Sequence, residues 1–126
     1  MNLTKIHHVA IITTNYQAAR HFYVDLLELP IIRENYRPER NDYKLDLQVG
    51  TSELEIFGVD DAPKRPNYPE AAGLRHLAFQ VDDLEGTILN LQKKGIACEA
   101  IRCDEYSQKR FTFFKDPDGL PLELHE

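Results

Sequence analysis

The strongest constraint on the fold is an internal repeat that relates the two halves of the chain by 68 positions. The segments "HHVAIIT" and "RHLAFQV" share a histidine, an apolar residue and an alanine in the same order. The same offset carries His8 onto His76 and Glu55 onto Glu123. A repeat of this length predicts one structural module that the chain builds twice.

Each half predicts the same order of elements: a strand, a helix and three further strands. The expected strands are 7–13, 29–35, 43–49 and 53–59 in the first half, and 76–81, 96–102, 111–115 and 120–126 in the second. Thr14 is the expected N-cap of the first helix. Asp82 is the expected N-cap of the second helix, and Glu85 three residues later completes a capping-box pattern. Gly95 is placed to end the second helix. The order βαβββ therefore occurs twice.

Length and composition predict a single domain over residues 1–126, because 126 residues with 42% hydrophobic content suffice for one core and not for two. Module one is expected over about 4–59 and module two over about 74–126. The connector, about 60–73, is rich in proline and lacks periodicity. The predicted fold class is α+β, with two tandem βαβββ modules forming a curved mixed sheet that encloses a metal-centred cleft.

The charge balance bears on the partners of the protein. A formal charge of −6 and a pI near 5.3 disfavour binding to nucleic acid or to anionic lipid. No apolar stretch reaches the ~20 residues that a membrane-spanning helix needs. We expect a cytoplasmic protein whose two cysteines are reduced thiols and whose partner is a small-molecule substrate.

Strand alternation separates the ionisable residues from the apolar ones. His8 shares a face with Ala10, whereas Val9 and Ile11 point to the opposite face. The same parity holds around His76, Glu55 and Glu123. Helices are expected to cover the apolar face, which leaves the four ionisable residues on the open face.

Two imidazoles and two carboxylates suit one first-row divalent ion, Zn, Ni, Co, Fe or Mn. The candidate ligands are His8, Glu55, His76 and Glu123. A histidine that begins a single strand is usually a surface residue, but matched placement in both copies of a repeat favours a shared site. Four protein ligands on a six-coordinate ion leave two positions for substrate, which predicts a catalytic metal.

Other residues are candidates for contact with the substrate. Phe111 and Phe113 are expected on the same face as the ligands, with Tyr43 and Leu45 at the repeat-equivalent positions. These side chains would form a partly apolar pocket or simply fill the interior of the sheet. Arg110 could clamp an anionic group or lie on a solvated loop.

The segments "HHVAI", "LRHLAF" and "FFKDPDGLPLELHE" resemble the vicinal oxygen chelate superfamily, and the resemblance spans essentially the whole chain. That superfamily includes glyoxalase I, bleomycin and fosfomycin resistance proteins, extradiol dioxygenases and methylmalonyl-CoA epimerase. The resemblance implies the doubled βαβββ fold, a homodimer, and metal ligands at His8, Glu55, His76 and Glu123.

This ligand set resembles the glyoxalase I branch, which implies a lactoylglutathione-lyase-like proton transfer on a small α-oxo or hemithioacetal substrate. The resemblance also implies that Glu123 or Glu55 moves the proton. The stretch "RENYRPERNDYKLDL" carries more charge than glyoxalase I would lead us to expect. Two alternatives stay open. One is an epimerase or thiol transferase of the same superfamily, and the other is a resistance-type protein that binds a small molecule without catalysis.

Overall fold

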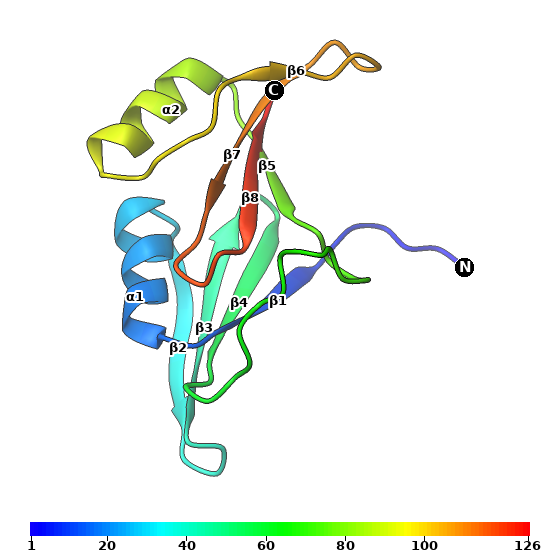
Figure 1. Cartoon of the computed structure of the whole chain (residues 1–126). Helices are drawn as coiled ribbons and strands as arrows, with labels where there is room; N and C mark the ends of the chain where they lie inside the picture. The colour runs from blue at the N-terminus through cyan, green and yellow to red at the C-terminus, as the bar shows by residue number, and fades with distance from the viewer. The chain divides into compact units, whose positions relative to one another are not determined.

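The computed structural model describes all 126 residues, and these divide into two compact units, residues 1–64 and 65–126. The boundary falls inside the predicted connector 60–73. Each unit contains one module with its own sheet and helix (Figure 1). The doubled module is thereby confirmed, whereas the single domain and the enclosed cleft stay predictions.

Unit 1 builds its module from four strands and one interrupted helix. Strand β1 (His8–Thr13) is followed by α1 (Tyr16–Arg20), which continues as the π-helix η1 (His21–Leu26). Strands β2 (Ile31–Arg37), β3 (Asp42–Val49) and β4 (Ser52–Gly58) complete it. The strand order is β1-β4-β3-β2, with β1 parallel to β4 and the other neighbours antiparallel.

Unit 2 repeats this arrangement. Strand β5 (Leu77–Gln80) precedes helix α2 (Leu84–Lys93), and β6 (Arg102–Cys103), β7 (Arg110–Lys115) and β8 (Pro121–His125) follow. The order β5-β8-β7-β6 again places the first strand parallel to the last. A mixed sheet with this order brings the first and last strands of each module side by side, although the sequence separates them by most of the module.

Each sheet buries one face, as the alternation predicts. In unit 1, Leu54 and Ile56 of β4 are buried together with Phe22 and Tyr23 of η1. In unit 2, Leu122 and Leu124 of β8 are buried, as are the apolar residues of α2, namely Leu84, Ile88 and Leu91. On the other face Ile12 stays 60% exposed. Neither unit contains a helix long and apolar enough to span a bilayer.

Both helices begin one residue later than the sequence suggests. Oδ1 of Asn15 accepts the Ala18 N–H at 3.1 Å, so Asn15 and not Thr14 is the N-cap of α1. Asp83, not Asp82, caps α2 by accepting the Gly86 N–H at 3.0 Å. Adjacent cap-forming side chains made both positions plausible, and the backbone conformation selects one. The predicted end of α2 at Gly95 is confirmed, with φ of +83°.

The predicted strand 96–102 is wrong except at its last residue, because β6 spans only Arg102–Cys103. Glu99 N–H donates to the carbonyl of Phe113 at 2.8 Å, but the Glu99 carbonyl accepts from the hydroxyl of Thr112 at 2.7 Å. A side chain thus takes the acceptor that a backbone ladder would use, and the edge segment pairs irregularly.

Candidate metal centre

The imidazole–carboxylate pair of unit 2 arises from the parallel pairing of β5 with β8. Ala78 lies opposite Glu123, so His76, two residues earlier, projects from the same face. Nε2 of His76 lies 2.9 Å from Oε2 of Glu123, and Glu123 is only 8% exposed. The pair is therefore preformed, with its carboxylate buried and its imidazole partly exposed.

Two phenylalanines flank this pair. Phe113 lies opposite Glu123 and Phe111 opposite His125 in the antiparallel pairing of β7 with β8. The ring of Phe113 meets that of His76 edge to face at 5.1 Å, and the two phenylalanine rings are 5.9 Å apart. The placement of Phe111 and Phe113 on the face of Glu123 is confirmed, and their contact with a substrate stays a prediction.

Unit 1 contains the equivalent pair at the same register. Ala10 lies opposite Glu55, as Ala78 lies opposite Glu123. Nε2 of His8 lies 3.5 Å from Oε2 of Glu55, and Nδ1 of His8 lies 2.9 Å from Nδ1 of His7. His7 thus contacts the ring nitrogen that does not face Glu55, which leaves Nε2 as the nitrogen of His8 available to a ligand.

The surroundings of the unit 1 pair are charged rather than aromatic. Nζ of Lys44 lies 3.1 Å from Oε1 of Glu55 and 2.6 Å from Oδ1 of Asp46, whose side chain is only 1% exposed. Nε of Arg33 lies 2.5 Å from the other oxygen of Asp46. Burial lowers the pKa of Lys44, but its hydrogen bonds to Asp46 and Glu55 outweigh burial and raise it overall. Lys44 is a fixed cation beside Glu55.

Sequence reasoning missed Lys44 and Asp46, and the cause is a shift of one residue. Asp46 lies opposite Glu55, nine positions apart, whereas Phe113 lies opposite Glu123, ten positions apart. The facing residues of β3 and β4 are thus one position closer in sequence than those of β7 and β8, so the repeat offset on β3 is 67. A shift of one residue moves every side chain of a strand to the opposite face.

The expected position of Tyr43 and Leu45 on the ligand face is therefore wrong. Tyr43 lies opposite Gly58, on the face that α1 covers, and its ring stacks on Tyr16 at 4.3 Å. Leu45 is fully buried opposite Ile56. Both side chains belong to the helix side of the sheet.

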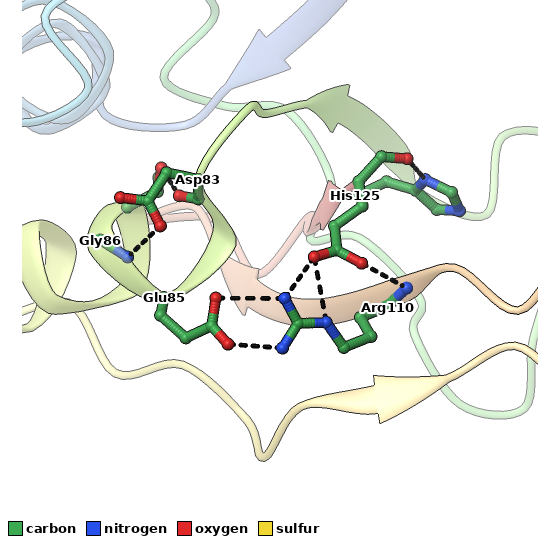
Figure 2. Close-up of polar contacts among 7 residues, drawn as sticks. Asp83, Glu85, Gly86, Arg110 and His125 are labelled. Carbon is green, nitrogen blue, oxygen red and sulfur yellow. Dashed lines mark hydrogen bonds and ion pairs between the residues drawn. The ribbon is translucent and has the colours of Figure 1, made fainter.

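Arg110 also lies apart from the His76–Glu123 pair. It alternates with Phe111, and its guanidinium donates to Glu85 of α2, as Figure 2 shows. The guanidinium also donates to Glu126. These contacts raise the pKa of Arg110 and lower the pKa of both carboxyl groups. The guanidinium is paired within unit 2 and so is not positioned as the expected anion clamp.

The donor chemistry of the two pairs fits a first-row divalent ion. Each pair offers an imidazole nitrogen and a carboxylate oxygen that already approach each other. Neither unit by itself gathers three histidine, cysteine, aspartate or glutamate side chains around one point.

Two βαβββ modules that each carry an imidazole–carboxylate pair at the same register define a protein of the glyoxalase type. The sequence profile of the Glyoxalase/Bleomycin resistance protein/Dioxygenase superfamily matches residues 5–124. The chain belongs to this superfamily.

Similar proteins span nearly the whole chain. The Bacillus subtilis protein YwkD, described as uncharacterized, is 52% identical over 127 residues and covers 100% of this chain and 99% of its own. The glyoxalase family protein from Enterococcus faecalis has a crystal structure that is 57% identical, with a TM-score of 0.94 and complete coverage of both chains. Human mitochondrial methylmalonyl-CoA epimerase is 24% identical over 99% of this chain and 75% of its own length.

Proposed function

We propose that this protein is a metal-dependent enzyme that moves a proton between adjacent carbons of a small α-oxo or hemithioacetal substrate, in a lactoylglutathione-lyase-like reaction. The observation that carries the proposal is the duplicated pair: Glu55 and Glu123 occupy the same register against their parallel neighbours, each within 3.5 Å of its histidine. Drift would not keep both pairs at matched places unless they acted together.

His8, Glu55, His76 and Glu123 would hold the ion. When bound, a divalent cation of this kind acts as a Lewis acid that makes a carbon-bound proton beside a polarised carbonyl easier to remove. The imidazoles present Nε2 to the site, and His7 supports this orientation of His8 through the contact with Nδ1.

Glu123 is the better candidate for the proton carrier. A carboxylate that shuttles a proton must reach the substrate, and Glu123 contacts His76 beside the ring of Phe113. Glu55 is held on its other oxygen by Lys44. We therefore assign removal of the proton from one carbon, and its return to the next, to the carboxylate of Glu123. Glu55 would serve mainly as a ligand.

Phe111 and Phe113 would contact the apolar part of the substrate. They share the face of Glu123 and present their rings edge to face. Aromatic walls exclude water from a proton-transfer step and strengthen the electrostatic interactions within the site.

The test has two stages. Elemental analysis of the purified protein should find about one divalent ion for each set of four ligands. If the protein binds none of Ni²⁺, Co²⁺ and Zn²⁺, the result would instead favour a protein that binds small molecules without catalysis. The loaded protein should then convert methylglyoxal with glutathione, or with another low-molecular-weight thiol, to the thioester. Conversion should disappear on chelation and return with metal.

A second candidate is an epimerase, because methylmalonyl-CoA epimerase aligns with 99% of this chain. The same residues would remove and return a proton at a single carbon. Incubation with methylmalonyl-CoA in deuterated water separates the two functions. Deuterium incorporation without thioester formation from methylglyoxal would favour the epimerase, and the reverse would favour the lyase.

A further inference from the structure

Glu55 and Glu123 are equivalent in the repeat but differ in one contact. Lys44 lies within 3.1 Å of Glu55. In unit 2 the position equivalent to Lys44, at the β3 offset of 67, is Phe111, which stacks on His125 and carries no charge. Only one of the two candidate carboxylate ligands therefore has a cation bound to it.

The ammonium group of Lys44 is held in place by a second carboxylate, that of Asp46. Asp46, two residues further along β3, shares its face and binds its ammonium at 2.6 Å. The Asp46 side chain is 1% exposed, and Arg33 contacts its second oxygen. Because Asp46 is buried and paired, it holds the Lys44 ammonium at a fixed position. Lys44 would keep this partner if Glu55 moved away.

We propose that Lys44 is an internal counter-ion that a divalent metal must displace from Glu55, and that Lys44 thereby sets the metal affinity of the site without being a ligand. This inference rests on the proposed function. Like charges a few ångströms apart repel strongly in a partly buried site. The ammonium therefore opposes the metal, and it also keeps Glu55 neutralised while the site is empty.

The direction in which metal affinity changes when Lys44 is lost separates this role from a merely structural one. Loss of a structural lysine would destabilise the protein and weaken or leave unchanged its affinity for metal. Loss of a competing cation should destabilise the metal-free protein, since Asp46 and Glu55 both lose a partner, and yet tighten metal binding. Two measurements on one variant should thus move in opposite directions.

The experiment is a calorimetric titration of the full, metal-free chain with Co²⁺, repeated by visible absorption. Lys44→Met should bind Co²⁺ roughly tenfold or more tightly than the unmodified protein. Lys44→Gln, which keeps a donor for Asp46, provides a second neutral variant if Lys44→Met folds poorly. Lys44→Arg keeps the charge and should bind within about twofold of the unmodified protein.

Lys93→Met is the matched control, because it removes the same charge from an exposed position on α2. Its Co²⁺ affinity should be unchanged. Equal or weaker Co²⁺ binding by both neutral Lys44 variants, with the unmodified protein binding normally, would overturn the role of Lys44 and leave the proposed function standing. Failure of every protein to bind Co²⁺ would overturn both.

Discussion

Nε2 of His76 lies 2.9 Å from a carboxylate oxygen of Glu123, a residue 47 positions later in the chain. The contact depends on the parallel pairing of β5 with β8, which places Ala78 opposite Glu123. His8 and Glu55 have the same separation in sequence and the same register in unit 1. The repeat thus preserves a chemical pair as well as a fold.

Glu123→Gln should leave the fold intact and remove the reaction. The amide keeps the shape of the side chain but cannot accept the proton, so turnover should fall by roughly 10²–10⁴. Loss of one anionic ligand should also weaken Co²⁺ binding by roughly tenfold. Steady-state kinetics and calorimetry measure the two effects.

His21→Ala is the control for the histidines. His21 lies on η1 and pairs with Asp25 on the exposed surface, so it contacts neither His8 nor Glu55 of its own unit. This variant should keep both turnover and metal affinity, whereas His76→Ala should lose both. Equal losses in the two histidine variants would contradict the assigned site.

Metal should stabilise the folded protein if the proposed ligands bind it. Free Ni²⁺ at about 100 times its dissociation constant would contribute about 2.7 kcal/mol to the free energy of unfolding. Chelation of the ion should lower the melting temperature accordingly, and added Ni²⁺ should restore it. A melting temperature that ignores both treatments would argue against the site.

Phe113→Ala and Phe114→Ala should differ although the residues are neighbours. Phe114 is 3% exposed on the core side of β7, so its truncation should cost about 3–5 kcal/mol in urea unfolding. Phe113 is half-buried on the ligand face, and its truncation should cost about 1–2 kcal/mol. Phe113→Ala should mainly raise KM for the substrate. A larger stability loss for Phe113→Ala would mean that β7 presents the opposite face to the core.

Arg110→Met should alter stability in a pH-dependent way. Arg110 lowers the pKa of Glu85 and Glu126 in the folded protein, so this stabilisation exists above the ordinary carboxyl pKa of about 4.3 and disappears as pH falls through the lowered values. These side chains are partly exposed and screened by solvent, so the melting temperature at pH 7 should drop by only roughly 1–4 °C.

The difference between Arg110→Met and the unmodified protein should shrink as the pH falls below about 4, where the carboxylates become protonated. Thermal melts across this range test the assignment. Arg102→Met offers a comparison, since Arg102 pairs with Glu99 and contacts the rings of Phe111 and Phe113. A difference for Arg110→Met that grows towards low pH would contradict the ion-pair explanation.

The sequence alone determined the doubled module and the face of the sheet on which each histidine and glutamate lies. Both follow from local information. The repeat can be read directly from the sequence, and strand alternation assigns each side chain to one face of the sheet without knowledge of the partner strand. The sequence also indicated that Phe111 and Phe113 share the face of Glu123, since β7 and β8 are joined by the short turn "DPDG".

Only the tertiary structure decided the face of Tyr43 and the surroundings of Glu55. The facing residues of β3 and β4 are one position closer in sequence than those of β7 and β8. Lys44, and not Tyr43, therefore lies on the open face. Register depends on the pairing between strands, and a repeat in the sequence does not predict that pairing. The charged contacts of Lys44 and Arg110 likewise join segments whose proximity no local pattern encodes.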